Sequence, residues 1–422
     1  MIEPMPRHPK LGPTGLDAQV PTEVADLQSQ SRKFAREVMR PVAAELDKMS
    51  ADDVVRPGSP LHDFLAEVKR TGLADLGALV QLPPAEQALT MPVLMEELGW
   101  GDAGLATLSI VRDVAKFTAF RLNSAELIER VGDGLGCFIS TQPDRGSDAI
   151  DHLGLETYPG MRPTVGNLTV RREGADYVVQ GQSSPWISGA PVASCGILQA
   201  ACDFGAGFYD HEGRMNYIGL MVPLDEPGVS KSPPLAKIGQ RSLPQGAIYF
   251  DSVRVPAEFV VAEGIDAHRD LATNLALAKT IVATAFVGVG RAAFDYAFAY
   301  THERSQGGVP LIRHQSVRAR IFQMWNRLEA SRALVRRAVA YHYGPYGPSA
   351  IGSITAKVHA TEASFALSQE AMRLFGANGL TPEYPVEKLL RDSQSSLIED
   401  GENTILGINV VAMLARPDSV DV

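Results

Sequence analysis

The chain has 422 residues, of which 45% are hydrophobic, and a formal net charge of −10 from 39 basic and 49 acidic residues. A chain of this length can bury a large core and is expected to form two to three domains. Nucleic-acid binding needs a clustered positive face, so the absence of a basic run excludes that class of partner. Three cysteines and nine scattered histidines show no ligand spacing, which argues against a metal and a disulfide framework.

The start of the chain lacks the apolar core of a secretory signal. No uninterrupted apolar stretch approaches the roughly 20 residues that a membrane span needs. We therefore expect a cytoplasmic protein without a membrane partner. Residues 1–21 contain prolines and glycines without helical periodicity, which indicates a flexible N-terminal arm.

An all-helical domain is predicted over residues 22–135. The first helix begins near Thr22, and Pro41 interrupts its pattern. Its apolar residues follow helical spacing: Val24, Leu27, Phe34 and Val38. Further helical stretches are residues 61–71, 93–98 and 125–131.

A β domain is predicted over residues 136–265, because short apolar runs there alternate with turn residues. Residues 168–170 and 177–179 flank the turn 173–176 and predict a hairpin. Residues 217–222 and 248–250 predict two further strands.

Long helices are predicted again in the last domain, residues 266–422. The segments with helical spacing are 278–303, 315–341, 355–375 and 386–397. The second of these carries an apolar stripe that is typical of a helical bundle: Val317, Ile321, Met324, Trp325 and Leu328. The predicted fold class is therefore α+β, in the order helices, sheet, helices.

The most informative segment lies near the C-terminus. A glycine turn at residues 376–379 (GANG) precedes a helix that starts after Pro385, and residues 398–403 (IEDGEN) place carboxylates directly before a glycine. This arrangement resembles the C-terminal signature of the acyl-CoA dehydrogenases. Those flavoenzymes use a carboxylate on such a turn to remove the proton alpha to a thioester.

Other motifs carry the same resemblance in the expected order, over residues 22–416. Residues 141–148 (TQPDRGSD) resemble the TEPGAGSD loop of the family, and residues 186–188 (WIS) resemble its WIT segment. Residues 237–241 and 250–256 are similar to the usual exit from the sheet. Residues 303–306 (ERSQ), with Gln315, are similar to the ERxxFG…Q pattern. The resemblance implies a helical N-terminal domain, a middle β domain and a C-terminal four-helix bundle.

FAD is the cofactor that the resemblance implies. Hydroxyls and amides at Thr141 and Ser147 would contact the flavin, with Trp186 as an aromatic wall and Ser188 as a polar handle. Glu402 replaces a threonine that lies near the flavin in the family. As ordinary structural residues, Trp186 would be a core tryptophan and Ser147 a turn serine.

The adenine half of FAD would be bound by a neighbouring subunit. The resemblance assigns this to Arg304, Gln315 and the turn at Arg373, Gly376 and Ala377, and it implies a homotetramer. The chain departs from the pattern here, since Arg373 replaces a glutamine, Ala377 a glycine, and Gly307 a phenylalanine. Gly376 is also suited to end the preceding helix.

Asp400 occupies the place of the catalytic glutamate, with Glu399 as the alternative base. Asp400 would take the α proton while the flavin accepts a hydride from the β carbon. Ser147, Lys279 and Gly401 would lie on the substrate side, and Lys279 would orient Asp400. Because three carboxylates lie within four residues, at least one should have a high pKa, meet a cation or point to solvent.

The leading hypothesis is an acyl-CoA dehydrogenase that passes electrons to an electron-transfer flavoprotein. The shorter aspartate and the altered TEPGAGSD loop keep a second hypothesis open, a same-fold oxidase, hydroxylase or lyase acting on an acyl thioester. A third is a non-catalytic protein that binds flavin or a partner. The length, branching and polarity of the acyl group are not predicted.

Overall fold

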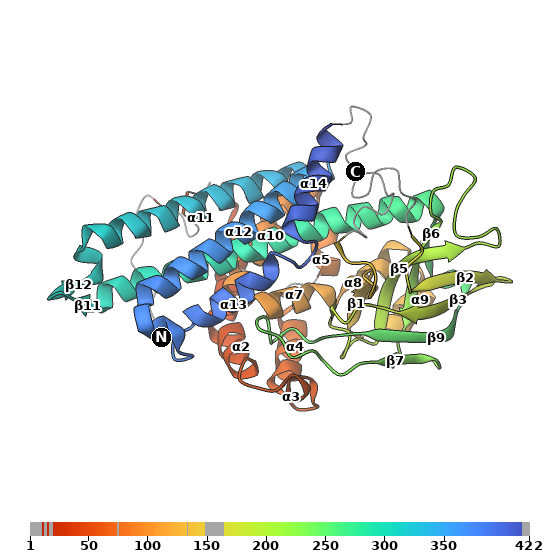
Figure 1. Cartoon of the computed structure of the whole chain (residues 1–422), viewed down its shortest axis with the longest axis horizontal. Coiled ribbons are helices and arrows are strands. Elements are labelled where there is room, and N and C mark those ends of the chain that lie inside the picture. The colour runs from red at the N-terminus through yellow and green to blue at the C-terminus, as the bar shows by residue number, and fades with distance from the viewer. Residues whose placement is uncertain are drawn as a thin grey trace.

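The computed structural model describes residues 11, 15–16, 20–73, 76–132, 134–147 and 164–415. N-terminal helices, a middle sheet and a C-terminal bundle follow one another along the chain, which confirms the predicted fold class (Figure 1). Most of the predicted arm, residues 1–21, lies outside the described residues. Within it, the backbone N–H of Leu16 donates to Glu329 Oε2 at 2.9 Å.

The N-terminal region is helical, as predicted. Its elements are α1 (Thr22–Phe34), the π-helix η1 (Ala35–Met39), α2 (Arg40–Leu46), α3 (Ala51–Val55), α4 (Pro60–Thr71), α5 (Leu76–Gln81), α6 (Pro84–Gly101), α7 (Ala103–Val111), α8 (Val114–Arg121) and α9 (Ala125–Val131). The expected interruption at Pro41 is wrong, because helical backbone continues through η1 into α2. Pro41 lies in the first turn of α2, next to a π turn, where a missing N–H is tolerated.

The middle region forms a mixed eight-stranded sheet in the order β10-β6-β5-β2-β3-β9-β7, with β1 paired to β5. Its strands are β1 (Gly136–Ile139), β2 (Thr169–Glu173), β3 (Asp176–Gln182), β5 (Cys195–Asp203), β6 (Tyr217–Pro223), β7 (Val229–Lys231), β9 (Ile248–Val255) and β10 (Val260–Glu263), which follows the 3₁₀ turn η3 (Ala257–Phe259). The predicted hairpin is confirmed as β2–β3. A separate two-stranded sheet pairs β4 (Ile187–Ser188) with β8 (Gln245–Gly246).

The C-terminal region is a bundle of long helices. Its elements are α10 (Gly264–Glu303), the hairpin β11 (Ser305–Gln306) and β12 (Val309–Pro310), η4 (Leu311–Arg313), α11 (Gln315–His342), α12 (Ala350–Phe375), η5 (Gly376–Leu380), α13 (Val386–Ser396) and α14 (Asn403–Leu414). Helix α10 begins well before the predicted residue 278. Its first turns bury Ala267 and Leu271 in a small cluster with Met215 and Tyr217, and this tertiary contact supports the early start.

The two large hydrophobic cores do not coincide with the three regions of the chain. One core joins the N-terminal helices to the bundle, and α6 packs so closely on α10 that a Cβ on Gly288 would lie 2.1 Å from Glu96 O. The other core belongs to the sheet and includes apolar residues of α8 and α9. Within the described part of the chain, α10 is the one helix long and apolar enough to cross a membrane, but most of its apolar stretch is buried.

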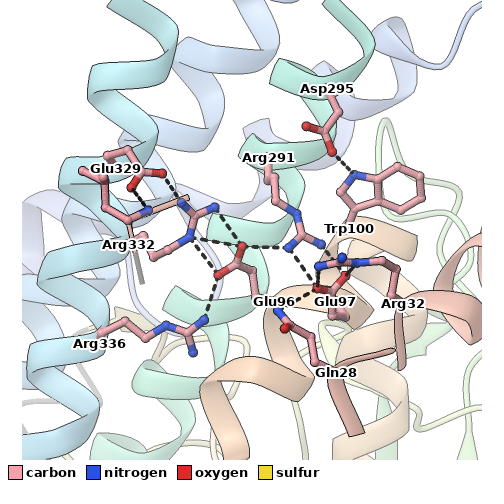
Figure 2. Close-up of polar contacts among 11 residues, drawn as sticks. Gln28, Arg32, Glu96, Glu97, Trp100, Arg291, Asp295, Glu329, Arg332 and Arg336 are labelled. Carbon is pink, nitrogen blue, oxygen red and sulfur yellow. Dashed lines mark hydrogen bonds and ion pairs between the residues drawn. The ribbon is translucent and has the colours of Figure 1, made fainter. Parts of the chain in front are cut away.

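A buried ion network ties α1, α6, α10 and α11 together (Figure 2). Adjacent glutamates of α6 are each 1% exposed and face four arginines: Glu96 and Glu97 with Arg32, Arg291, Arg332 and Arg336. Burial alone would raise the pKa of Glu96, but the guanidiniums of Arg332 and its neighbours lower it to about 2. The network is therefore ionised at neutral pH and fixes the N-terminal helices on the bundle.

Candidate active site

Asp400 lies on the tight turn between α13 and α14. Its φ is +53° and that of Gly401 is +104°, so both residues occupy the left-handed region. Aspartate tolerates this region better than most non-glycine residues because its short polar side chain bonds locally. The backbone N–H of Asn403 donates to Leu397 O at 3.1 Å and closes the turn.

Lys357 of α12 forms hydrogen bonds to this turn. Its side chain is fully buried, and its Nζ donates to Gly401 O at 2.7 Å and to Asn403 Oδ1 at 2.8 Å. Asn403 Nδ2 in turn donates to Thr361 Oγ1 at 3.1 Å. The sequence interpretation missed Lys357. The available signal was a lysine between Ala356 and Val358 on an apolar helix, where an unpaired ammonium is costly.

Burial and two nearby ammonium groups have opposite effects on the pKa of Asp400. Its Oδ2 is shielded from solvent and accepts no hydrogen bond from the residues that the structure describes. Burial raises the pKa of Asp400, while the ammonium groups of Lys279 and Lys357 act in the opposite direction. Lys279 is 2% exposed and its Nζ donates to Leu275 O at 3.3 Å. A carboxylate with a free, water-shielded oxygen and a raised pKa is equipped to accept a proton.

The three neighbouring carboxylates occupy different environments, as charge repulsion predicted. Burial raises the pKa of Glu399 to about 7, and the hydrogen bond from Gln240 opposes that shift. Glu402 instead accepts hydrogen bonds from the backbone N–H groups of Thr404 and Ile405 at 2.9 and 3.1 Å. Although desolvation acts the other way, these bonds lower the pKa of Glu402. Its carboxylate thus caps α14.

A second buried cluster joins all three regions beside the base turn. Lys388 Nζ bonds to Asp392 Oδ2 at 2.6 Å and also pairs with Asp102, the N-cap of α7. Asp102 accepts from Ser242 Oγ, and Asp392 accepts from the backbone N–H of Gln240, each at 2.5 Å. The N-terminal helices, the loop before β8 and α13 are therefore fixed relative to one another next to Asp400.

The structure brings the expected flavin-ring residues to this same end of the molecule. Ser147 Oγ accepts from the backbone N–H of Glu402 at 2.9 Å, which links the 141–147 loop to the base turn. Thr141 Oγ1 lies 2.7 Å from Ser184 Oγ, and Ser188 Oγ accepts from Gln245 Nε2 at 3.2 Å. Asp148, the last residue of that motif, lies outside the described residues.

Trp186 is 57% exposed, so it is not the core tryptophan of the alternative interpretation. Its backbone N–H donates to Ser184 Oγ at 3.3 Å, which places it beside Thr141. An open indole face next to several hydroxyl groups fits a planar heteroaromatic ring with polar edges.

The residues expected at the adenine end lie at the opposite end of the bundle. Arg304 follows the last residue of α10 and donates weakly to Gln306 Oε1 at 3.4 Å, while Gln315 begins α11 and is exposed. Lys279 and Arg304 are separated along α10 by on the order of 35–40 Å at 1.5 Å per residue. One chain therefore does not bring Arg304 near Asp400.

The turn after α12 borders an open surface pocket of about 570 Å³. The pocket is lined by Arg320, Met372, Arg373, Gly376 and Leu380. Gly376 has a φ of +62°, which favours glycine, and Ala377 beside it is exposed. Arg320 and Arg373 both pair with Glu370, so this surface carries one net positive charge from the three side chains.

Comparison with known proteins agrees with this geometry. Residues 269–414 match the model of the acyl-CoA dehydrogenase C-terminal domain. The chain is 26% identical over 393 residues to cyclohexane-1-carbonyl-CoA dehydrogenase of Geobacter metallireducens, covering 91% of this chain and 95% of the relative. It is 29% identical over 401 residues to benzylmalonyl-CoA dehydrogenase of Aromatoleum aromaticum, covering 93% and 97%.

Solved structures show the same fold. A glutaryl-coenzyme A dehydrogenase in complex with glutaryl-CoA superposes with a TM-score of 0.79 at 24% identity, covering 95% of this chain and 97% of the other. Butyryl-CoA dehydrogenase from Megasphaera elsdenii superposes with a TM-score of 0.78 at 22% identity, covering 95% and 100%. Motifs, fold and relatives converge, and the chain belongs to the acyl-CoA dehydrogenase family of FAD-dependent oxidoreductases.

Proposed function

We propose that the protein desaturates an acyl-CoA between its α and β carbons, with Asp400 as the base that removes the α proton. The observation that carries this proposal is Asp400 Oδ2, a shielded carboxylate oxygen without a partner in the described structure. The turn that carries it is tied to the expected flavin loop through Ser147 and Glu402. Burial raises the pKa of Asp400, and the ammonium groups of Lys279 and Lys357 oppose that shift.

The donor set fits FAD. Trp186 would cover one face of the ring system, and Thr141, Ser147 and Ser188 would contact its polar edge. When bound, FAD supplies the acceptor for the β hydride. The chain itself orients the α carbon against Asp400 Oδ2, and the buried Lys279–Lys357 pair stabilises the ionised base before proton transfer.

Purified protein is expected to be yellow, to release FAD and not FMN, and to bleach when an acyl-CoA is added without oxygen. Chromatography of the released flavin and anaerobic spectra across an acyl-CoA panel are the measurements. A 2-enoyl-CoA product supports dehydrogenation, whereas a hydroxylated or cleaved product supports the alternative same-fold chemistry. Protein that takes up FAD but bleaches with no acyl thioester contradicts the proposed activity.

Replacing Lys357 with methionine should slow flavin reduction at neutral pH and move its pH dependence upward. The variant removes the donor to Gly401 O and one of the two cations that lower the pKa of Asp400. Because Asp400 must be ionised to accept a proton, the rate should rise with pH through its pKa, and that rise should shift to higher pH. Stopped-flow reduction over a pH series measures both effects.

Lys279→Met is the matched control for this prediction. Lys279 also lowers the pKa of Asp400, but its Nζ bonds to Leu275 O and not to the base turn. It should reproduce the pH shift with a smaller loss of the limiting rate at high pH. Equal limiting rates in both lysine variants would contradict a positioning role for Lys357.

We also propose that two subunits share each cofactor, within a homotetramer. The ring-end residues and the group around Arg304 and Arg373 lie at opposite ends of α10 in one chain, so an extended cofactor would contact both only across an interface. Arg373→Glu should weaken FAD retention and dissociate the oligomer, as measured by light scattering and flavin content. A flavin-loaded monomer of the wild type would contradict shared binding.

Electron-transfer flavoprotein is the proposed electron acceptor, and the cytoplasm the proposed location. The family resemblance supports the acceptor. Reduction of an electron-transfer flavoprotein by the substrate-reduced enzyme tests the first, and fractionation of the native cells tests the second.

A further inference from the structure

The side chain of Gln245 lies between a partly buried lysine and the residues expected at the flavin ring. Gln245 of β8 is the cross-strand partner of Ser188 in β4. Its Oε1 accepts from Lys237 Nζ at 2.7 Å. Its Nε2 donates to Trp186 O at 3.1 Å and to Ser188 Oγ at 3.2 Å. Both donor hydrogens of this amide are therefore used within the chain.

The neighbours of Gln245 allow only one orientation of its amide. An ammonium group such as Lys237 Nζ donates and does not accept, whereas a carbonyl oxygen such as Trp186 O accepts and does not donate. Turning the amide over would place its NH₂ group against the ammonium and its oxygen against the carbonyl, and both hydrogen bonds would be lost. The amide nitrogen therefore faces Ser188 and donates to its hydroxyl group.

The surroundings of Lys237 keep it a donor. Its Nζ also donates to Leu243 O at 2.7 Å. Burial lowers the pKa of Lys237 to about 8. Its charged neighbours are three carboxylates that oppose this shift and one ammonium group that assists it: Glu399, Asp392, Asp102 and Lys388. Lys237 is therefore protonated at pH 7 and orients the amide of Gln245.

Backbone hydrogen bonds keep Gln245 opposite Ser188. The N–H of Leu235 donates to Gln245 O at 2.8 Å, and the N–H of Gly189 donates to Pro244 O at 2.8 Å. Strands β4 and β8 have only two residues each, so these flanking bonds extend their pairing.

The hydroxyl group of Ser188 is left with a proton to donate to a ligand. Its Oγ accepts from Gln245, the side chain is half-buried, and no residue that the structure describes accepts its proton. A serine hydroxyl carries one donor hydrogen, so this hydrogen is available to an acceptor outside the chain. The ring edge of a flavin offers such acceptors at its carbonyl oxygens and unprotonated nitrogens.

We propose, on the basis of the FAD-dependent function above, that Lys237 and Gln245 are positioning residues for the cofactor. They fix the Ser188 hydroxyl group in the direction in which it donates to an acceptor atom on the flavin ring edge. Neither residue is assigned a contact with the ring, because both act through Ser188.

Nuclear magnetic resonance of the enzyme reconstituted with FAD that is isotope-labelled in its ring nitrogens and carbonyl carbons tests this assignment at pH 7. The signal of a ring acceptor depends on the hydrogen bond that it accepts. Ser188→Ala should displace one acceptor signal, and Gln245→Met should displace the same signal in the same direction, because the hydroxyl group is then free to turn. Each variant should raise the Kd for FAD by about 2- to 10-fold, the effect of one hydrogen bond.

The combined variant separates action through Ser188 from a general disturbance of the site. Adding Gln245→Met to Ser188→Ala should displace the signal no further than Ser188→Ala alone, because residues that act through one bond are not additive. Gln245→Asn is the second variant at this position. Its amide is shorter by about 1.5 Å, the length of one carbon bond, so it should not bridge both neighbours and should behave as Gln245→Met does.

Lys231→Met is the matched control for Lys237→Met. Lys231 is also a partly buried lysine of the β domain, but its Nζ donates to Ala193 O and not to Gln245. Lys237→Met should displace the signal that depends on Ser188, and Lys231→Met should leave it in place. Equal displacement in both lysine variants would contradict the role of Lys237.

The remaining outcomes are also decisive. Ring signals that do not respond to Ser188→Ala overturn the inference, as does a signal at its wild-type position in both Gln245 variants. A displacement by Gln245→Met that persists in the Ser188→Ala background shows that Gln245 does not act through Ser188. FAD that binds with these signals but is not reduced by any acyl-CoA overturns the proposed function alone, whereas wild-type protein that binds no FAD overturns both.

Discussion

Replacing Asp400 with asparagine should slow anaerobic reduction of the flavin by acyl-CoA by about 10²–10⁴-fold, the loss typical of removing a general base. Asparagine has nearly the same volume but accepts no proton at this position. Binding of FAD and of the acyl thioester should survive, because neither depends on the charge of Asp400. Stopped-flow reduction gives the rate, and spectral titration of the oxidised flavin gives the Kd.

Two variants control for this result. Asp400→Glu tests reach, since one added methylene extends the side chain by about 1.5 Å, the length of one carbon bond. It should retain measurable activity with an altered acyl preference. Glu399→Gln should retain more activity than Asp400→Asn. The opposite order would move the base to Glu399, and wild-type rates in both variants would refute carboxylate catalysis from this turn.

Replacing Glu96 with glutamine should lower the free energy of unfolding by about 3–5 kcal/mol, the cost of breaking a buried ion pair from one side. The change leaves Arg332 and Arg336, which bond to Glu96 at 2.9 and 3.1 Å, without that carboxylate (Figure 2). Urea denaturation at fixed protein and FAD concentration measures the loss. The loss should affect stability far more than the chemistry at Asp400.

The pH dependence of this effect has a definite sign. The pKa of Glu96 falls from its ordinary 4.5 to about 2 in the folded protein, so its contribution is complete above pH 4.5 and disappears as the pH falls toward 2. The stability difference between wild type and Glu96→Gln should shrink over that range. Glu173→Gln is the control, because Glu173 and Arg254 form an exposed pair 3.1 Å apart, and exposed pairs contribute at most about 1 kcal/mol. An equal loss in both variants would contradict the role of burial.

Local features of the sequence were sufficient for most elements and for the family. Alternation around residues 173–176 predicted the β2–β3 hairpin, and helical spacing predicted α1, α4, α9 and α11. The ordered motifs pointed to the acyl-CoA dehydrogenases, because each motif is a continuous segment whose residues are read directly. The predicted roles of Asp400, Ser147 and Trp186 rest on the same motifs.

The tertiary structure alone decided what depends on contacts between distant segments. Lys357 belongs to no motif, and its role follows from its bond to Gly401. Gln240 lies in the motif at residues 237–241, but its bond to Glu399, far along the chain, could not be read from that motif. The early start of α10 depends on burial against Met215 and Tyr217.

The sequence by itself determined the order of elements and the family, since these depend on local periodicity and on adjacent residues, and it supplied Asp400 as the proposed base. Which charges are buried, which acceptors lack donors and which lysines face Asp400 depends on the packing of α10, α12 and the loop before β8 around one turn. Burial and electrostatic interaction act through space, so the pKa of Asp400 and the hydrogen bond between Gln240 and Glu399 follow only from the folded arrangement.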